Sequence, residues 1–402
     1  MMGEWKEYRY TDLATIIGGG TPKTSVPEYW SGEIPWLSVK DFVSVTKYVY
    51  DTEKYISELG LLNSSTKLLE KNDIVISARG TVGAMAMIPY PMCFNQSCFG
   101  LRGNNIVDKN FLYYLTRTKV DELRKTAHGS VFDTITRETF DNLRCLVPPL
   151  QTQQKIGNIL SSLDSKIELN KRINDNLEQQ AQALFKSWFV NFELFKNGQF
   201  VDSELGKIPK GWKVGYLNEI ADIIMGQSPN GSTYNENGEG IIFYQGRAEF
   251  GTRFPSIRLF TTNPTRIAPA NSILISVRAP VGDINITHKE CCIGRGLASA
   301  VSRTNKSAFL LYTLFSLKSD LDRFNAEGTV FGSINRKTLE SLKILIPTND
   351  IISKFEAIVA SMDQQILTLH LESENLKILR DTLLPKLMSG ERSVIHKENN
   401  DD

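Results

Sequence analysis

An internal repeat constrains the fold of this chain more than any other feature. Val131–Phe140 (VFDTITRETF) returns as Val330–Leu339 (VFGSINRKTL), and Ile76–Gly83 (ISARGTVG) returns as Ile275–Gly282 (ISVRAPVG). Both pairs are separated by 199 residues. A repeat of this length predicts two copies of one domain, each with its own core.

The start of each copy repeats with a different offset. Trp5-Lys6 and Gly19–Pro22 correspond to Trp212-Lys213 and Gly226–Pro229, 207 residues later. An insertion of eight residues therefore falls between Phe42 and Asp73 and their counterparts. Two similar domains with different surface residues suit a partner that has two related but unequal sites.

Each copy is followed by a long segment with a heptad pattern. In residues 151–190 the apolar stripe alternates steps of four and three, which is the spacing of a coiled-coil seam: Ile156, Leu160, Leu163, Ile167, Asn170, Asn174, Leu177, Ala181, Leu184 and Trp188. Residues 348–389 repeat it at an offset of 199: Phe355, Val359, Met362, Ile366, Leu369, Ser373, Leu376, Arg380, Leu383 and Leu387. We expect the two helices to pack against each other in antiparallel orientation, with the polar seam residues fixing the register. The alternative is that each helix packs on its own domain.

These segments give the predicted organisation, a mixed α+β fold with an internal pseudo-twofold repeat. The first domain is predicted at 1–150, a central helix at 151–195, the second domain at 196–347, a C-terminal helix at 348–390, and a polar tail at 391–402. The two domains are expected to be separated by the two long antiparallel coiled-coil helices.

Composition is that of a globular protein, with 41% hydrophobic and 23% charged residues. No apolar run approaches the ~20 residues of a membrane span, so no membrane is expected. Five cysteines without CxxC spacing favour a reducing cytoplasm over disulfides or zinc. The net charge of +1 conceals a difference between the copies. Residues 1–150 are neutral, whereas residues 205–347 hold 17 Lys and Arg against 11 Asp and Glu.

Motifs that carry chemistry are missing from the sequence. Gly18–Thr24 is glycine-rich but lacks the P-loop spacing, and is interpreted as a tight turn. The four histidines are isolated from one another and have no metal-ligand spacing. Asp73 and Asp283 have no acidic counterpart in the other copy, so a duplicated pair of catalytic carboxylates is not predicted. We therefore predict no catalytic residue, no metal and no cofactor in this chain.

Polar residues near the repeated motifs are the candidate DNA contacts. Arg79 and Arg278 each follow an apolar strand and precede a Val-Gly turn. An arginine fork there can bind guanine or phosphate, or can brace the turn. Gly-Ser and Gly-Thr turns before a helix can also offer backbone N–H groups to phosphates. The candidates are Lys23, Lys40, Arg79, Gln96, Ser130 and Arg137 in the first copy, and Gln227, Arg247, Arg278, Arg295, Thr329 and Arg336 in the second.

Five segments resemble the specificity subunits of type I restriction-modification systems, and the resemblance covers nearly the whole chain. They are Val147–Ile156, Ala183–Phe195, Ser203–Trp212, Ile346–Phe355 and Thr382–Glu391. The fourth, which opens the second helix, is degenerate and lacks the usual Pro-Leu-Gln run.

The resemblance implies two target-recognition domains that each read one half of a split sequence in double-stranded DNA, with the two helices as spacer. It implies that this subunit does no chemistry. Two methyltransferase subunits would use S-adenosylmethionine, and restriction and translocase subunits would use ATP and Mg²⁺. The alternatives are a stand-alone nuclease or methyltransferase, and a coiled-coil scaffold without DNA specificity. Apolar helix residues outside the main stripe are the candidates for docking the methyltransferases: Ile159, Phe185, Phe189, Ile358 and Leu379.

Overall fold

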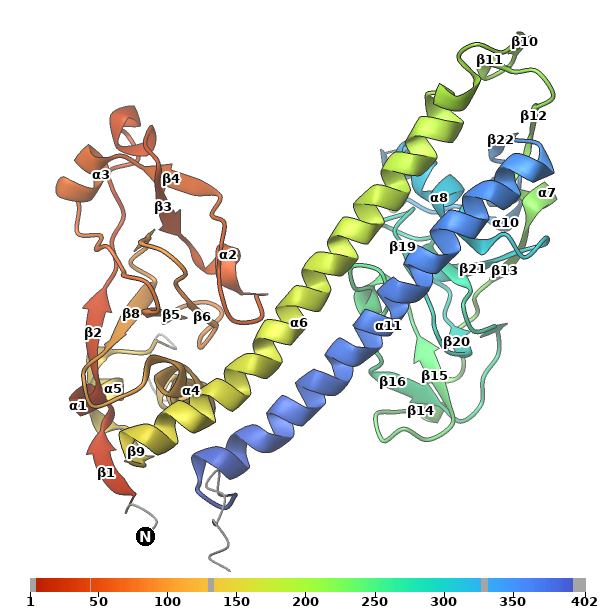
Figure 1. Ribbon diagram of the computed structural model, residues 1–402. Coiled ribbons are helices and arrows are strands. Elements are labelled where there is room, and N and C mark those ends of the chain that lie inside the picture. Colours follow the sequence, from red (N-terminus) through yellow and green to blue (C-terminus); the bar gives the residue numbers. More distant parts are fainter. Residues whose placement is uncertain (1–4, 44, 129–133, 327–331, 393–402) are drawn as a thin grey trace, which may run out of the picture. The chain divides into compact units, whose positions relative to one another are not determined.

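The structure is a computed structural model that describes residues 5–43, 45–128, 134–326 and 332–392. The chain divides into two compact units. The first unit comprises residues 1–172 and 370–402, and the second comprises residues 173–369. Each unit contains one copy of the repeat and a part of each long helix (Figure 1).

The first unit is built on a four-stranded antiparallel sheet of order β2-β8-β5-β6. Its strands are β2 (Ala14–Gly18), β5 (Ile74–Ser77), β6 (Met85–Met87) and β8 (Cys98–Gly103). A three-stranded sheet contains β4 (Lys54–Ile56), β3 (Ile34–Leu37) and β7 (Cys93–Phe94), with β3 and β7 parallel. A third sheet pairs β1 (Lys6–Arg9) with β9 (Arg144–Val147). The helical segments are α1 (Tyr10–Leu13), η1 (Pro27–Trp30), α2 (Val39–Phe42), α3 (Glu58–Leu62), α4 (Lys109–His128) and α5 (Arg137–Asn142).

The second unit repeats this topology. Its four-stranded sheet has the order β13-β21-β18-β19, from β13 (Ala221–Met225), β18 (Ile273–Ser276), β19 (Ile284–Ile286) and β21 (Leu297–Ser302). The register repeats as well, because Ile74 pairs with Leu101 and Ile273 pairs with Ala300. The second sheet has five strands: β14 (Tyr234–Asn235), β16 (Leu259–Thr261), β15 (Ile241–Tyr244), β20 (Cys291–Ile293) and β17 (Ile267–Ala268). Strand β12 (Lys213–Tyr216) pairs with β22 (Lys343–Ile346).

The remaining elements of the second unit include a hairpin formed by β10 (Phe200–Ser203) and β11 (Gly206–Pro209). The helical segments are α7 (Leu217–Ile220), η4 (Gly231–Thr233), η5 (Arg247–Glu249), α8 (Ser307–Ser316), α9 (Lys318–Ala326) and α10 (Arg336–Glu340). Where the first unit has the continuous helix α4, the second has two helices that meet at Leu317.

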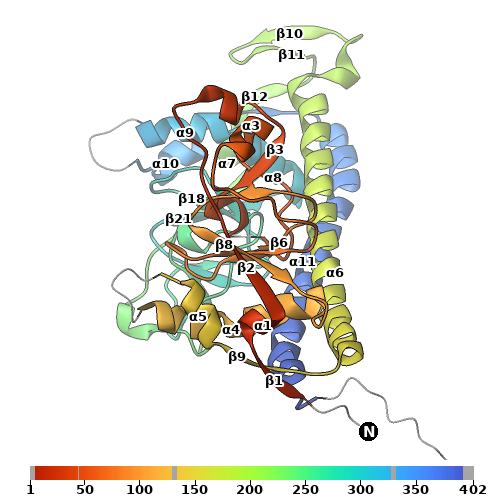
Figure 2. The same ribbon diagram turned by 90° about the vertical axis from the view of Figure 1, so that its left-hand side faces the viewer.

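Alternating side chains of the central strands separate two cores. In β5, Ile74 and Ile76 face a core that includes α4 and α5, whereas Val75 faces the core under the three-stranded sheet. Strand β18 does the same with Ile273 and Ile275 on one side and Leu274 on the other. Figure 2 shows the consequence in the first unit, where the β3–β4 segment and the α4–α5 pair lie on opposite sides of the four-stranded sheet.

The heptad stripe marks the buried faces of α6 (Leu150–Phe185) and α11 (Asn349–Met388). Within the first unit, the side chain of Asn170 donates to Ser373 Oγ at 3.2 Å, and Arg380 contacts Asp164. Within the second unit, Asn174 donates to the carbonyl oxygen of Ile366 at 3.2 Å. Residue numbers rise in one helix as they fall in the other, so the predicted antiparallel pairing is confirmed inside each unit.

Packing of each helix on a globular domain, stated above as an alternative, occurs together with this pairing. Ile156 and Leu160 belong to the core of the first domain, and Phe355 and Val359 belong to that of the second. The regular part of α6 ends at Phe185, before a π-helical turn, η2 (Lys186–Val190), and a short 3-10 segment, η3 (Glu193–Phe195).

No described helix is long and apolar enough to cross a membrane. The five cysteines are buried free thiols.

Candidate nucleic-acid interface

One end of the four-stranded sheet collects loops from four parts of the repeat. In the first unit, Gly18 pairs with Phe99 and Ser77 pairs with Cys98. The last residues of β2 and β5 therefore meet the first residues of β8. We call the residues that continue from these ends, 19–24, 78–84, 95–97 and 135–137, the first loop cluster.

Backbone hydrogen bonds connect these loops to one another. The amide of Ala78 donates to the carbonyl of Ser97 at 2.8 Å, and the amide of Ile135 donates to that of Ala78 at 3.1 Å. The β3 end joins as well, because the amide of Asn95 donates to the carbonyl of Leu37 at 2.9 Å.

The second unit forms the same cluster from residues 226–230, 277–283, 294–296 and 334–336. Val277 donates to Gly296 at 2.9 Å, and Ile334 donates to Val277 at 3.0 Å. Both bonds lie 199 residues after their counterparts in the first unit. The repeat in sequence is therefore a repeat in hydrogen bonding, and it defines two equivalent loop clusters.

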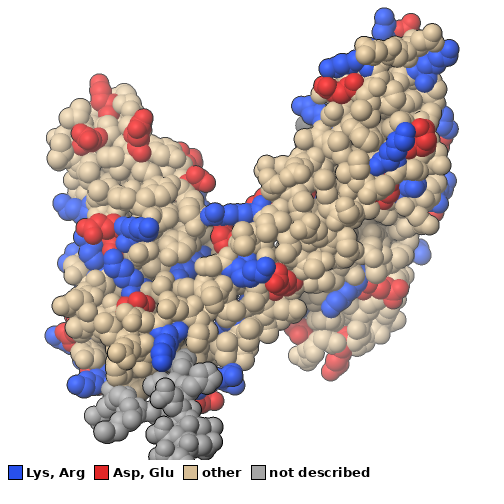
Figure 3. Space-filling model, viewed as in Figure 1, with Lys and Arg blue, Asp and Glu red and all other residues tan. Residues whose placement is uncertain are grey.

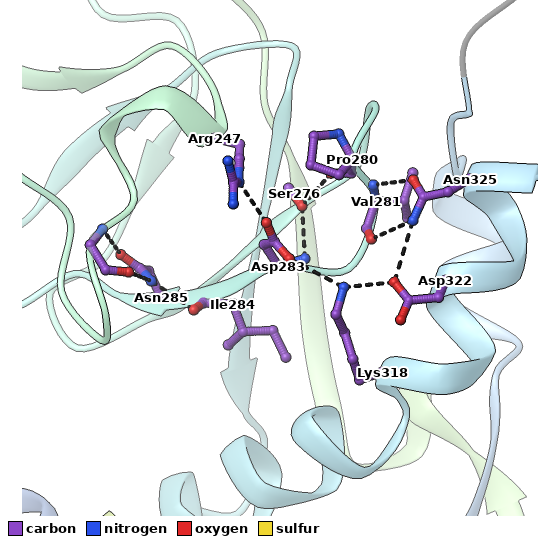
Figure 4. Close-up of polar contacts among 11 residues, drawn as sticks. Arg247, Ser276, Pro280, Val281, Asp283, Ile284, Asn285, Lys318, Asp322 and Asn325 are labelled. Atoms are coloured by element: carbon purple, nitrogen blue, oxygen red, sulfur yellow. Dashed lines mark hydrogen bonds and ion pairs between the residues drawn. The ribbon is translucent and has the colours of Figure 1, made fainter. Parts of the chain in front are cut away.

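A buried serine shapes the loop that carries each repeated arginine. The hydroxyl of Ser276 donates to the carbonyl of Pro280 at 2.8 Å and accepts from the amide of Asp283 at 2.8 Å (Figure 4). In the first unit, the hydroxyl of Ser77 donates to the carbonyl of Thr81 and accepts from the amide of Ala84 at 2.9 Å. The serine of the repeated Ile-Ser-x-Arg motif is thus the residue that closes the turn. This role was not predicted from the sequence, although the serine recurs in both copies.

Close approach of neighbouring backbone explains why Gly19 and its counterpart Gly226 carry no side chain. A Cβ on Gly19 would lie 2.1 Å from the carbonyl oxygen of Asn95, and one on Gly226 would lie 2.1 Å from that of Gly294. Any side chain at either position would separate the loops. The interpretation of Gly18–Thr24 as a tight turn therefore has a specific cause.

All the described candidate DNA contacts are exposed. Lys23, Arg79, Gln96 and Arg137 lie in or next to the first cluster, and Gln227, Arg278, Arg295 and Arg336 lie in or next to the second. Lys40 on α2 and Arg247 on η5 occupy equivalent positions three residues after β3 and β15. Ser130 and Thr329 lie outside the described residues.

The side chains of Arg79 and Arg278 make no hydrogen bond or ion pair with any residue that the structure describes. Their loops are braced by other groups: Arg124 Nε donates to the carbonyl of Val82 at 2.9 Å, and Asn325 exchanges two hydrogen bonds with the backbone of Val281. Among the described residues, the groups that brace the two turns are therefore Arg124 and Asn325, and not Arg79 and Arg278.

Other candidates already have partners inside the chain. Arg247 Nε donates to Asp283 at 2.6 Å, and Arg336 Nε donates to Glu340 at 2.8 Å. Gln96 accepts a hydrogen bond from Thr21. On the face drawn in Figure 3, Lys and Arg are scattered among Asp and Glu, so charge alone does not locate the interface there.

The helix residues expected to dock a partner divide into two groups. Ile159, Ile358 and Leu379 are exposed by 40%, 41% and 45%, as expected. Phe185 and Phe189 are only 7% and 4% exposed, because they pack with Phe309 and Phe355 in the core of the second unit. The prediction that these two phenylalanines form an exposed docking surface was wrong.

Buried charges that the sequence analysis missed hold the domains to the helices. Lys47, 4% exposed, donates to Asn110 Oδ1 at 2.8 Å and Ser161 Oγ at 2.5 Å in the first unit. Arg253, 8% exposed, pairs with Glu178 and Asp363 in the second unit. The two cations are equivalent, because their carbonyls accept from Met87 and Ile286, which are 199 residues apart.

The described residues contain no group of three or more His, Cys, Asp or Glu side chains arranged to hold a metal ion.

Comparison with known proteins gives a consistent result. The model of the type I restriction modification DNA specificity domain matches the chain twice, at residues 2–179 and 209–378. The type I restriction enzyme MjaIX specificity subunit of Methanocaldococcus jannaschii is 29% identical over 97% of this chain and 94% of its own length. The HindI specificity subunit of Haemophilus influenzae is 24% identical over 97% of this chain and all of its own.

A solved structure shares the fold. The crystal structure of the S subunit of a type I restriction-modification system from M. genitalium matches with a TM-score of 0.61 at 18% identity, over 96% of both chains. The family model covers both repeats, and the relatives match along nearly their whole length. The chain therefore belongs to the type I restriction-modification DNA specificity family, as a DNA-recognition subunit and not a catalytic one.

Proposed function

We propose that the two loop clusters are the DNA-reading surfaces, and that each reads one half of a bipartite target in double-stranded DNA. The equivalence of their backbone hydrogen bonds carries this proposal. One framework presents different side chains at matched exposed positions, such as Lys40 and Arg247, or Gln96 and Arg295. Two copies of one framework with different contacts suit two half-sites of unequal sequence.

Arg79 and Arg278 are the central contacts in this proposal. Each extends from a turn that the backbone and a serine hydroxyl hold in place. Each guanidinium group is free of partners among the described residues. An arginine held on a rigid turn loses little conformational freedom when it binds, so more of the contact energy remains for discrimination between bases.

Chemistry belongs to other subunits in this proposal. Two methyltransferase subunits would bring S-adenosylmethionine, and restriction and translocase subunits would bring ATP and Mg²⁺. Ile159 and Ile358 support two equivalent docking sites, because they are 199 residues apart and equally exposed. Apolar side chains that stay exposed on otherwise packed helices are typical of protein interfaces. Leu379 adds a further exposed apolar side chain on α11.

The two helices are proposed to set the gap between the half-sites. Their heptad seam joins α6 to α11 inside each unit, and a long paired helix is stiff over its length.

Substitution of each arginine tests the reading. Arg79→Ala should lower discrimination at one half-site by about 1–3 kcal/mol and leave the other half-site's preference intact, and Arg278→Ala should do the reverse. Competition binding by the assembled complex, with duplexes altered in one half-site at a time, measures both. An equal loss across all sequences, with a salt dependence smaller by about one unit, would show a phosphate contact instead. Sequence preference that neither variant alters would refute the assignment.

A further inference from the structure

Asp283 lies between two cations of the second unit (Figure 4). Its Oδ2 accepts from Arg247 Nε at 2.6 Å, and its Oδ1 accepts from Lys318 Nζ at 3.2 Å. Lys318 in turn donates to Asp322 Oδ1 at 2.7 Å. The amide of Asp283 is fixed by the hydroxyl of Ser276, so the carboxylate is held at its backbone as well as at its side chain.

The electrostatics keep this carboxylate charged. Burial acts to raise the pKa of Asp283, but hydrogen bonds from Arg247 and Lys318 outweigh it and leave the pKa below its ordinary value. Arg247 is therefore held by a negative charge throughout the neutral pH range.

The ion pair with Asp283 uses only Nε of Arg247. The two terminal amino groups of Arg247 bond to no described residue. Its side chain is 56% exposed, and it lines a cavity of about 650 Å³ together with Asp283 and Lys318. A guanidinium group that is hydrogen-bonded through Nε presents its two terminal amino groups in a fixed direction. Two parallel donors of this kind match the O6 and N7 acceptors of guanine.

Arg247 also lies beside the second loop cluster. It begins η5 directly after Gln245 and Gly246, which lie against the cluster glycines. A Cβ on Gly294 would lie 2.5 Å from the carbonyl oxygen of Gln245, and one on Gly296 would lie 3.2 Å from Cα of Gly246. Arg247 therefore follows a segment that packs directly against the loop that carries Arg295. That loop is hydrogen-bonded to the loop of Arg278.

The first unit lacks this arrangement. Lys40 occupies the position of Arg247, and Ala84 occupies that of Asp283. A lysine presents a compact ammonium group on a flexible stem and not a planar fork, and Ala84 supplies no carboxylate to hold it, so the direction of any contact from Lys40 is not fixed in this way. The two units therefore differ in the kind of recognition that this position allows.

We propose that Asp283 is a positioning residue that aims Arg247 at a guanine in the second half-site, and that the first half-site has no such contact. This inference rests on the proposed function. In the contact, the two terminal amino groups of Arg247 donate to O6 and N7 of one guanine.

The test uses the complete complex, after methylation-aware sequencing has given its target. Each guanine of the second half-site is replaced in turn by 7-deazaguanine, which lacks the N7 acceptor. We expect one replacement to weaken binding by the wild-type complex, and replacement of that G·C pair by A·T to weaken it roughly 5- to 150-fold. With Arg247→Ala, which removes every donor of the side chain, both penalties at that position should be largely lost.

Two variants test the positioning role. Asp283→Ala reproduces the residue of the first unit, where the equivalent loop folds with Ala84, and Asp283→Asn keeps the size of the side chain. Both should lower discrimination at the same guanine and leave the first half-site unchanged. Arg303→Ala is the matched control for Arg247→Ala, because Arg303 Nε also donates to a carboxylate, Asp222, at 2.8 Å but lies outside the loop cluster.

Three results would overturn the inference. The first is an equal loss across all sequences in Arg247→Ala, with a smaller salt dependence, which indicates a phosphate contact. The second is binding that no 7-deazaguanine weakens. The third is unchanged discrimination in both Asp283 variants. Failure of the proposed function looks different, because the wild-type complex would then show no preference at either half-site.

Discussion

A buried ion pair joins the two long helices inside the first unit, and its removal should be costly. Arg380 Nη1 on α11 donates to Asp164 Oδ1 on α6 at 2.6 Å, and the two side chains are 7% and 1% exposed. The hydroxyl of Tyr114 donates to the other carboxylate oxygen at 2.5 Å. In Arg380→Met this carboxylate keeps one hydrogen bond but loses its counter-charge, so we expect the first unit to lose about 3–5 kcal/mol of stability at pH 7.

Urea denaturation of the purified chain, followed by circular dichroism, measures the loss on the transition of the first unit, because the two units need not unfold together. Arg380→Met combined with Asp164→Leu should recover a large part of the stability, since the buried carboxylate is removed together with its arginine. Lys377→Met is the control, because Lys377 pairs with Glu374 on the exposed surface and should contribute less than about 0.5 kcal/mol. A loss below about 1 kcal/mol at pH 7 would refute this reasoning.

Three further predictions address the first unit, the partner and the spacer. Burial lowers the pKa of Lys47 to about 8, so this residue makes the unfolded chain bind more protons than the folded chain between pH 8 and 10.5. Across this range the free energy of unfolding of the wild type should rise by about 3 kcal/mol relative to that of Lys47→Met, and a difference that does not change with pH would refute the prediction. Ile159→Arg and Ile358→Arg should each remove one of the two methyltransferase subunits from the co-purified complex, whereas the control Glu168→Arg should remove none. If both isoleucine variants retained two methyltransferase subunits, these docking sites would be excluded. Seven residues inserted after Asn174 and seven after Ser373 keep the heptad phase and add about 10 Å of helix. The gap between half-sites should grow by about three base pairs in methylation-aware sequencing, and an unchanged gap with full activity would show that the helices are not the spacer.

The sequence predicted those parts of the fold that depend on periodicity. The repeat offset placed equivalent strands, and the four–three stripe placed the buried face of both helices. Asp164 was not predicted because it lies one residue outside the stripe, and because its partners Tyr114 and Arg380 are distant from it in sequence. Phe185 and Phe189 were wrongly predicted to be exposed for a related reason. A heptad pattern describes contact with one partner helix, but these two rings also pack into the core of the second domain.

The candidate interface was predictable to the extent that it follows from turns and exposed cations. The repeated Arg79 and Arg278 pointed to the loops, and the structure places them there. The contact between Arg247 and Asp283 was not predicted from the sequence. The sequence offered Asp283 only as a candidate catalytic carboxylate, and its counterpart in the first copy, Ala84, excludes a duplicated catalytic pair. A carboxylate that appears in one copy alone indicates a difference between the copies, and three-dimensional structure is needed to show which cation it holds.

The serine-closed turn has a consequence for how new specificities can arise. The turn around Arg79 is held by Ser77, by backbone groups and by Arg124, none of which involves the side chain at position 79. The conformation of the loop therefore does not depend on the side chain at position 79, and we expect this position to accept many residues without a loss of folding. The same holds for Arg278 in the other copy. If the two arginines read bases as proposed, random variation at these two positions would explore base preference on an unchanged scaffold, and one half of the target would change while the other is inherited intact.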